Sequence, residues 1–436
     1  MSRPPLRVAV LGAGTVGREV VRAFESFPDR LAPDGGPRLE LASVAVRDLA
    51  RARRSGIDPA LLTDAPAHLV ADPSIDVIVE LLGGDEPATT LIAAALAAGK
   101  PVVTANKHAI AHHGPSFERA ARSTGAALRF EAAVGGGIPV LAPLASLGAD
   151  RVERVRGIVN GSTNHLLTEM ARGGRSYEEA FAEARNAGYL EADPSADIDG
   201  IDAANKLAIL IRLAFGGWLD PDAIVRRPAT VGGDSTWSGP AGIGGVTAAH
   251  IAGAAALGIA VKLVADARRT GDDAIEASVV PTGVPLDDPL GRTDGVTNRI
   301  EVRADPLGSV AFGGPGAGGG ATASAVLRDL LAVDRGEGST WAGLPAAFDG
   351  HGLRLAGPPL SATDRGWFAV VSPDAGDRLG HDGAHGGPHV RTARSGGGIA
   401  IHLSRISLAE ARTRLARAGA PPDALVLPVD ETAAPP

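Results

Sequence analysis

The chain has no cysteine, and this absence excludes several kinds of chemistry at once. Disulfide bonds, thiolate metal sites and cysteine nucleophiles all need a sulfhydryl group, and a cysteine-free chain fits a reducing compartment. The sequence also has no excess of basic residues. Its net charge of −8 argues against binding to nucleic acid or to an anionic membrane surface.

Long apolar runs are missing as well. The longest apolar stretch, residues 246–261, carries His250 and is shorter than the ~20 residues that a membrane-spanning helix needs. The first residues, MSRPPLRVAVLGAG, have no apolar signal-peptide core and lead directly into a strand-like run. We therefore expect a soluble, cytoplasmic protein that binds neither nucleic acid nor membranes.

What the chain does have is an alternation of apolar strands and helices over residues 1–135. Strand-like runs occur at residues 6–11, 39–46, 75–82, 101–105 and 127–134. Strands that alternate with helices predict an α/β fold, a Rossmann-type parallel sheet covered on both faces. Residues 136–312 mix helical and strand-like runs, which predicts a second, α+β domain. Residues 346–436 have little hydrophobic periodicity, and we expect them to form a small C-terminal segment.

A glycine turn, GAGTVG, connects the first strand to the first helix. Its glycines stand at positions 12, 14 and 17, the spacing of a dinucleotide-binding turn. In such a turn Gly12 allows the tight bend, Gly14 lets the backbone approach a pyrophosphate, and Gly17 lets helix and strand pack closely. Because the turn follows the first strand and opens the first helix, we favour a dinucleotide site over a turn that serves packing alone.

The end of the second strand is where a Rossmann domain reads the adenosine ribose of its cofactor. An acidic residue there would favour NAD. Arg47 stands at this point instead, followed by Asp48 and further arginines. Since an arginine can pair with a 2′-phosphate in a forked geometry, we favour NADP over NAD, with a solvated basic helix as the alternative.

Residues 188–206, GYLEADPSADIDGIDAANK, gather five carboxylates ahead of one lysine. If the segment that begins near residue 200 is helical, Asp202 and Lys206 stand at i and i+4 on one face, and Asp199 is expected to cap its N-terminus. Carboxylates could hold a substrate ammonium, and a lysine could give a proton to a carbonyl oxygen. From composition alone, a solvated acidic loop with a surface ion pair is the more common arrangement.

Seven sequence motifs follow one another in order across residues 1–335. They are VLGAGTVG (10–17), VELLGG (79–84), GKPVVTANK (99–107), FEAAVGGGIPV (130–140), GIVNGSTN (157–164), GYLEADPSADIDGIDAANKLAIL (188–210) and GGPGAGGGATASAVLRDL (313–330). Together they resemble the homoserine dehydrogenase family. The resemblance implies an oxidoreductase of threonine and methionine biosynthesis, which reversibly reduces L-aspartate 4-semialdehyde to L-homoserine with NADH or NADPH.

The resemblance also implies how the chain is divided. Residues 1–135 would form the dinucleotide-binding domain, with residues 313–335 returning to it, and residues 136–312 the catalytic and dimerisation domain. Residues 346–436 resemble the family's regulatory ACT domain only faintly, so we expect little inhibition by L-threonine. The small-molecule substrate is an amino acid, and the expected assembly is a homodimer or homotetramer.

Individual residues receive roles from the same resemblance. Lys206 would donate and accept the proton, and Lys107 would approach the substrate from the other domain. Substrate contacts are implied for Glu191, Asp197 and Asp202. Together with Arg47, cofactor contacts are implied for Gly12, Gly14, Thr15, Val16, Gly17, Thr104, Lys107, Gly188 and Gly318. A monovalent cation, Na⁺ or K⁺, would be held by Glu131 and by the backbone oxygens of Val134, Gly136 and Ile138, unless this glycine loop is only a hinge.

Other functions fit the sequence less well, and a different Rossmann oxidoreductase acting on an amino acid would not be expected to carry the motif of residues 188–206. A phosphorylating aldehyde dehydrogenase needs the cysteine nucleophile that the chain lacks. A catalytically silent, dinucleotide-sensing homologue would be expected to have lost Lys206 or Asp202. Metal binding is suggested by the four-residue spacing of two histidine groups, but zinc needs three or four ligands on a rigid frame, so solvated histidines are preferred. The two groups are His108 with His112, and His381 with His385 and His389.

Overall fold

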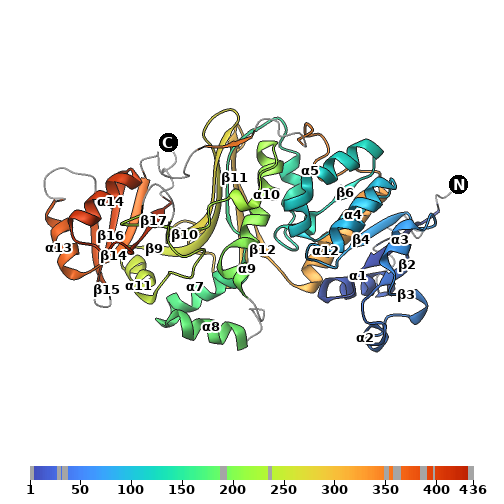
Figure 1. Ribbon diagram of the computed structural model, residues 1–436, viewed down its shortest axis with the longest axis horizontal. Coiled ribbons are helices and arrows are strands. Elements are labelled where there is room, and N and C mark those ends of the chain that lie inside the picture. The colour runs from blue at the N-terminus through green and yellow to red at the C-terminus, as the bar shows by residue number, and fades with distance from the viewer. Residues whose placement is uncertain are drawn as a thin grey trace.

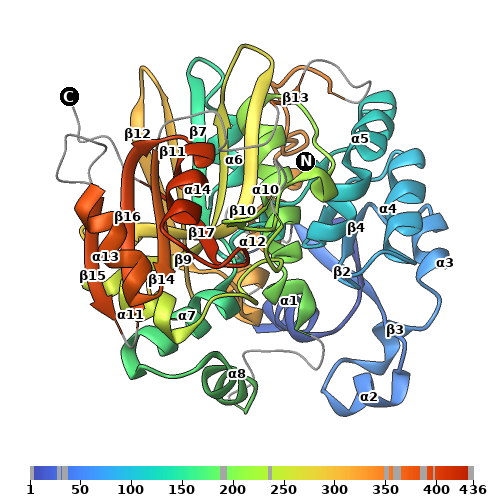
Figure 2. The same cartoon turned by 60° about the vertical axis from the view of Figure 1, so that its left-hand side comes forward.

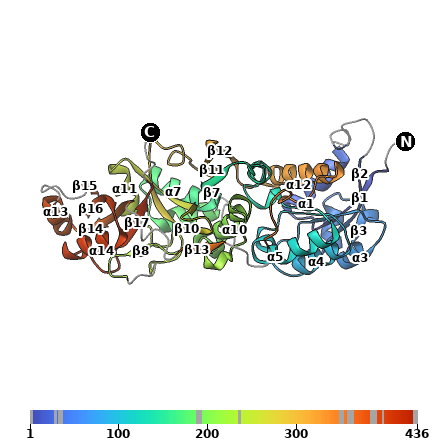
Figure 3. The ribbon, with the colours of Figure 1, turned by 90° about the horizontal axis from the view of Figure 1, so that it is seen from above.

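The computed structural model describes residues 4–26, 31, 38–186, 194–233, 238–347, 353–356, 365–382, 390–395 and 398–430. Three parts of the chain lie in a row, with the N-terminal part at one end and the C-terminal part at the other (Figures 1 and 3). Among the described residues, no helix is both long and apolar enough to cross a membrane.

Six parallel strands form the sheet of the N-terminal part, in the order β3-β2-β1-β4-β5-β6. The strands are β1 (Leu6–Leu11), β2 (Leu39–Ala45), β3 (Leu62–Thr63), β4 (Val77–Glu80), β5 (Val102–Thr104) and β6 (Leu128–Arg129). This order is that of a doubly wound dinucleotide-binding sheet, which binds its ligand at the carboxyl ends of the strands. The predicted Rossmann-type fold is therefore confirmed.

Helices cover both faces of this sheet (Figure 3). They are α1 (Thr15–Ser26), α2 (Leu49–Arg54), α3 (Pro66–Ala71), α4 (Ala88–Ala97), α5 (Lys107–Thr124) and, from much later in the chain, α12 (Gly319–Asp334). Side chains alternate along β1, so Val8 and Val10 pack in one cluster with residues of α1 and α12, while Ala9 and Leu11 pack in another with residues of α4 and α5. Helix α12 thereby completes one face of the sheet.

The predicted strand over residues 127–134 is shorter in the structure. β6 ends at Arg129, and Glu131–Ala133 form a 3-10 turn, η3. The backbone turns here because the buried Glu131 carboxylate accepts hydrogen bonds from the start of α6 (Leu141–Ala145), at 2.6 Å from Val140 N and 2.8 Å from Leu141 N. An extended strand could not bring Glu131 back to that helix.

In the described residues that follow, an eleven-stranded sheet runs through the rest of the molecule. Its first five strands are neighbours in the order β12 (Gly308–Pro315), β11 (Thr297–Asp305), β7 (Arg151–Ile158), β9 (Ile259–Arg269) and β10 (Ala274–Pro285), all antiparallel. The other described helices of this part are α7 (Gly161–Gly173), α8 (Tyr177–Asn186), α9 (Ser195–Ile198), α10 (Ile201–Phe215), α11 (Ala248–Ala256) and the short η4 turn (Pro221–Ala223). This mixture is the predicted α+β domain. The short η2 turn (Pro59–Leu61) belongs to the N-terminal part.

The C-terminal part has more order than its sequence pattern predicts. It contains β14 (Arg365–Val371), α13 (Pro373–Asp382), β15 (Val390–Ser395), β16 (Gly398–Ile406), α14 (Leu408–Arg417) and β17 (Leu425–Val429). The sequence of elements is β-α-β-β-α-β, the ferredoxin-like arrangement. β17 pairs in parallel with β10 at Gly283 and Val429, so this part continues the central sheet (Figure 2). Short β13 (Arg354–Leu355) pairs with β10, and β8 (Ala229–Thr230) pairs with β17.

His250 gives this junction a pH dependence. It lies in α11 against Phe368 of β14, and its Nδ1 accepts the N–H of Thr247 at 3.1 Å, which requires a neutral ring. Burial lowers the pKa of His250 from its usual 6.5 to about 4. Between these two pKa values the unfolded chain binds a proton at His250 that the folded chain does not. The contribution of the neutral ring to the free energy of unfolding is therefore complete above pH 6.5 and is lost as the pH falls towards 4, by about 2 kcal/mol between pH 7 and pH 5.

Denaturation of the wild type and of a His250→Gln variant at several pH values tests this. The variant should be less stable at pH 7, and the gap between the two proteins should narrow by about 2 kcal/mol at pH 5. A gap that does not change with pH would show that folding leaves the pKa of His250 unchanged.

Candidate active site

A first cavity, of ≈ 310 Å³, opens at the carboxyl ends of β1 and β2. It is lined by Gly12, Ala13, Gly14, Thr15, Arg18, Val46, Arg47, Asp48, Arg51, Ala52, Ser55, Leu81 and Leu82. The predicted glycine turn thus borders a cavity at the edge where Rossmann sheets bind their ligands.

The three glycines of the turn make two kinds of close approach possible, one within the protein and one to a dinucleotide. A Cβ on Gly12, whose φ is +106°, would lie 2.6 Å from Leu81 O, and one on Gly17 would lie 2.0 Å from Gly12 O. A Cβ on Gly14 would meet nothing within 4 Å. Gly12 and Gly17 therefore permit the close packing of turn, strand and helix, while Gly14 leaves open space at the N-terminus of α1, where a pyrophosphate fits.

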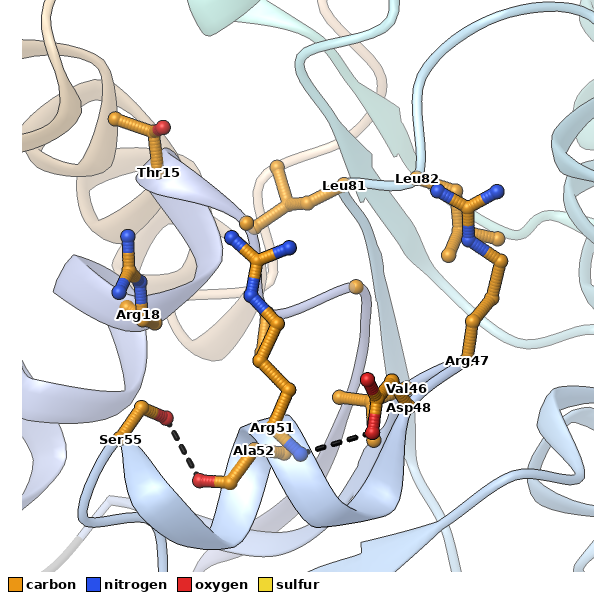
Figure 4. A pocket seen from close by; sticks show the side chains of 13 residues that line it. Thr15, Arg18, Val46, Arg47, Asp48, Arg51, Ala52, Ser55, Leu81 and Leu82 are labelled. Atoms are coloured by element: carbon orange, nitrogen blue, oxygen red, sulfur yellow. Dashed lines mark hydrogen bonds between the residues drawn. The ribbon is translucent and has the colours of Figure 1, made fainter.

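Three arginines reach into this cavity from separate elements (Figure 4). Arg47 follows β2, Arg18 lies on α1 and Arg51 lies on α2. The neighbouring acid, Asp48, accepts the N–H of Arg51 at 2.8 Å and caps α2. The sequence argument assigned Arg47 to the cofactor and noted Arg51 in the arginine run that follows it. It missed Arg18, because the direction of α1 relative to β2 cannot be predicted from the local sequence pattern.

A second cavity, of ≈ 670 Å³, lies between the dinucleotide-binding sheet and the central part. Its lining combines Val16, Ala105, Lys107, Ala132, Ala133 and Gly136 with Asn160, Gly161, Ser162, Asp197, Asp202, Lys206, Val296, Pro315, Gly316, Ala317, Gly318 and Thr322. The structure thus brings Lys107, at the start of α5, to the same space as Lys206 of α10.

Asp202 connects the two lysines. Its Oδ2 accepts a hydrogen bond from Lys206 Nζ at 2.7 Å, and its Oδ1 lies 3.1 Å from Lys107 Nζ. Lys206 Nζ also donates to Val159 O at 2.7 Å. Burial of Asp202 acts to raise its pKa, but the charges of Lys206 and Lys107 outweigh burial and hold the pKa well below its usual range. Asp202 therefore stays ionised at every physiological pH and orients both ammonium groups.

Asn160 is a site residue that the sequence argument did not single out. Its Nδ2 donates to Asp197 Oδ1 at 2.7 Å and to Asp202 Oδ2 at 2.8 Å. Its Oδ1 accepts the N–H of Thr163 and caps α7. An asparagine before a small residue at the start of a helix could have been predicted as the N-cap. Its hydrogen bonds to Asp197 and Asp202 could not, because they depend on how α9 and α10 approach α7.

The acidic segment is described only in part. Asp197 in α9 and Asp202 in α10 both line the second cavity. Gly188, Glu191 and Asp193 lie outside the described residues. The prediction for Asp199 was wrong, because the N-cap of α10 is Gly200, with a φ of 75°, and no described side chain caps that helix. The chain turns through a left-handed glycine there, so Asp199 ends α9 instead.

The other residues predicted to contact the cofactor do not all lie at the same cavity. Thr15 borders the first cavity, whereas Val16 and Gly318 border the second. Thr104 borders neither, since its fully buried side chain donates to Glu80 Oε2 at 2.6 Å.

The predicted cation loop follows β6. Gly136 lines the second cavity, but the Glu131 carboxylate is buried and accepts three backbone N–H groups, the third from Ala142 at 2.8 Å. Three donors occupy three of its about four acceptor directions, which leaves one for a cation. Val134 and Ile138 are buried on either side of the glycines.

His108 and His112 line neither of the two cavities. The rings of His108 and His112 are 4.3 Å apart between centroids, and a ring nitrogen of His112 lies within 4.8 Å of carboxylate oxygens of Asp220 and Asp222. Both aspartates are exposed. His385 and His389, and the side chain of His381, lie outside the described residues.

Comparisons with known proteins agree with this geometry. The family model for the homoserine dehydrogenase NAD-binding domain matches residues 12–131, and the one for homoserine dehydrogenase matches residues 139–331. A homoserine dehydrogenase from Synechocystis sp. is 41% identical over 336 residues, which cover 75% of this chain and 73% of that protein.

Two solved structures extend the comparison. A homoserine dehydrogenase from Thiobacillus denitrificans is similar with a TM-score of 0.83 at 32% identity, over 98% of both chains. A hyperthermophilic archaeal homoserine dehydrogenase in complex with NADPH has a TM-score of 0.61 at 28% identity, over 76% of this chain and 97% of that one. The chain therefore belongs to the homoserine dehydrogenase family, NAD(P)-dependent oxidoreductases that act on a CH–OH group.

Proposed function

We propose that this chain reversibly reduces L-aspartate 4-semialdehyde to L-homoserine, with Lys206 as the proton donor to the aldehyde oxygen. The observation that carries the proposal is the convergence of Lys206 and Lys107 on Asp202, within a cavity that also borders the glycine-rich turn of α12. A bound nicotinamide dinucleotide supplies the hydride for this reduction.

The chain's own groups account for the remaining needs of the reaction. Lys206 has two of its three N–H groups directed to Asp202 and Val159 O, so the third can face a carbonyl oxygen in the cavity. Lys107 is partly exposed and can neutralise negative charge on the substrate. Asp197 keeps acceptor capacity beyond its bond to Asn160, which suits it to hold the substrate ammonium. Glu191 is proposed as a second contact of this kind.

An assay with purified protein, aspartate semialdehyde and each reduced cofactor tests the proposal. Semialdehyde-dependent oxidation of cofactor is expected, and homoserine should support the reverse reaction. Cofactor binding without turnover would favour the dinucleotide-sensing alternative.

NADP is the proposed cofactor, because Arg47, Arg18 and Arg51 surround the end of β2 where a 2′-phosphate would lie. The relative in complex with NADPH supports this choice. Arg47→Ala should weaken NADPH binding about 10- to 100-fold, the loss expected for charge-assisted hydrogen bonds, and weaken NADH binding much less. Titration of each cofactor by fluorescence gives both dissociation constants.

Arg53 offers a matched control for this variant. It lies on the same helix, α2, but is exposed and does not line the cavity. Arg53→Ala should leave both dissociation constants close to wild type. Equal weakening of NADPH and NADH by Arg47→Ala would mean that Arg47 does not contact the 2′-phosphate.

A monovalent cation, Na⁺ or K⁺, is proposed at the loop after β6. The remaining acceptor direction of Glu131, with the carbonyl groups of Val134, Gly136 and Ile138, supplies oxygen ligands for it. Exchange of both ions for tetramethylammonium, which is too large for such a loop, should lower activity at constant ionic strength. Unchanged activity would remove the cation from the proposal.

We further propose a cytoplasmic homodimer or homotetramer, on the composition and the family resemblance. Residues 1–135 and 313–335 are proposed as the dinucleotide-binding domain, residues 136–312 as the catalytic and dimerisation domain, and residues 346–436 as a degenerate ACT-like domain with little response to L-threonine. Light scattering measures the assembly, and activity at rising threonine concentration measures the response. A monomer, or saturable inhibition by threonine, would contradict the respective statement.

A further inference from the structure

Glu80, at the end of β4, is a carboxylate that the proposed reaction does not use. Its side chain is fully buried among the apolar residues of the dinucleotide-binding sheet. An unpaired carboxylate in such a place is costly, so its partners decide what it does. Within the described part of the chain, the hydrogen bonds to its carboxylate come from the loop that follows β4 and from Thr104, the last residue of β5.

The first set of bonds shapes the loop after β4. Glu80 Oε1 accepts the N–H of Leu82 at 2.8 Å and that of Gly83 at 3.1 Å. Leu82 lines the first cavity, beside the glycine turn. One oxygen of Glu80 thus sets the path of a loop that faces the cofactor site.

The second set reaches the base of α5. Glu80 Oε2 accepts the hydroxyl proton of Thr104 at 2.6 Å, and Thr104 Oγ1 accepts the N–H of Asn106 at 2.9 Å. Asn106 caps α5 by accepting the N–H of Ala109 at 3.1 Å. The next residue, Lys107, is the first of the helix and carries the ammonium group that meets Asp202.

Asn106 also closes the network into a ring. Its Nδ2 donates to Gly84 O at 2.8 Å, in the same loop whose start is held by Glu80. The ring therefore runs from Glu80 through Thr104 and Asn106 to Gly84 and back. It fixes the distance between the cofactor-facing loop and the first turn of α5.

We propose that Glu80 is a positioning residue for Lys107, which it places through Thr104 and Asn106. The inference rests on the proposed role of Lys107 in the active site. Lys107 has a long, partly exposed side chain, and its ammonium meets Asp202 of the other part of the molecule. Where that ammonium lies therefore depends on where α5 begins. A rigid ring at that point reduces the conformations among which the ammonium would otherwise be distributed.

Glu80→Gln tests the ring with a minimal change of shape. A glutamine can still accept from Leu82 and Gly83, but its amide then presents N–H groups to the Thr104 hydroxyl, where the carboxylate accepted. The hydroxyl proton loses its acceptor and the bond to Asn106 is disturbed. We expect kcat to fall about 10- to 100-fold, the cost of a misplacement near 1 Å, with the NADPH dissociation constant within about twofold of wild type.

A double-mutant cycle with Lys107→Ala separates positioning from general damage. If Glu80 acts through Lys107, Glu80→Gln should change kcat by less than about twofold in the Lys107→Ala background. Equal factors in both backgrounds would overturn the proposal, as would a normal kcat for Glu80→Gln alone. A fully active Lys107→Ala single variant would instead overturn the role of Lys107 itself, and the proposal with it.

Glu118→Gln is the matched control. Glu118 is also a fully buried glutamate of this domain, but it lies further along α5 and pairs with Arg212 at 2.8 Å. Its variant should lower the melting temperature while kcat per folded enzyme stays at the wild-type value. If Glu80→Gln does not fold, Thr104→Val breaks the same ring at its next link and is carried through the same cycle, with the same outcomes deciding.

Discussion

Replacing Lys206 with alanine should lower kcat by about 10²- to 10⁴-fold, the usual contribution of general acid catalysis, or roughly 3–5.5 kcal/mol of barrier. The Lys206 ammonium is held by Asp202 and Val159 O at 2.7 Å each, so its position is fixed before the substrate binds. Its removal takes away the proton donor but does not touch the first cavity. NADPH affinity should therefore stay close to wild type, and steady-state kinetics with a cofactor titration measure both quantities.

Two further variants sharpen this result. Lys206→Arg should not restore full activity, because arginine keeps its proton too firmly to run the reverse direction. Lys107→Ala should be assayed under identical conditions, since Lys107 shares Asp202 with Lys206. If Lys206→Ala kept near-normal turnover while Lys107→Ala was inactive, the proton-donor role would pass to Lys107.

Asp430→Ala should destabilise the protein by about 3 kcal/mol, in the range for breaking a buried ion pair. Asp430 follows β17 and is buried against two arginines of β7. Arg154 Nη2 donates to it at 2.9 Å and Arg156 Nη1 at 2.6 Å. Burial raises the pKa of Asp430, but both arginines outweigh burial and hold the pKa below its usual range. Denaturant unfolding at pH 7 measures the loss.

Asp430→Ala should also disturb the positions of active-site residues. Strand β7, which Asp430 holds through its two arginines, leads directly into Val159 and Asn160, and these contact Lys206 and Asp202. Asp272→Ala is the control, because its ion pair with Arg151 of β7 is exposed and such pairs contribute little. An Asp430→Ala variant as stable as wild type would mean that the remaining acids satisfy Arg154 and Arg156 without it.

Much of the N-terminal fold could be predicted because its signals are local. The β-branched runs and the glycine turn report strand, bend and helix within a few residues of one another. β17, by contrast, has the sequence LVLPV, and its place between β10 and β14 depends on pairing with residues far away in the chain. A short strand with a proline carries no information about its neighbours. The ferredoxin-like arrangement could therefore not be predicted from local sequence patterns.

The candidate site divides in the same way. Asp202 and Lys206 are one helical turn apart, so their contact follows from periodicity. Lys107 meets Asp202 only because two separately folded parts dock, and the family resemblance, not spacing, brought it into the prediction. Asn160 and Arg18 were missed because their roles arise from the packing of helices that the sequence does not orient.

The late return of α12 to the first sheet sets an order of events during synthesis. Ala323, Val326 and Leu330 complete the cluster that covers Val8 and Val10, yet the ribosome adds them long after β6 has been made. At roughly 5–20 residues per second, the interval between Arg129 and Gly319 is on the order of 10–40 s. During that time one apolar face of the nascent sheet is covered by α1 but still lacks α12. Ribosome-bound chains stalled before Gly319 should therefore be cleaved by protease within residues 6–129 far faster than chains stalled well after Asp334.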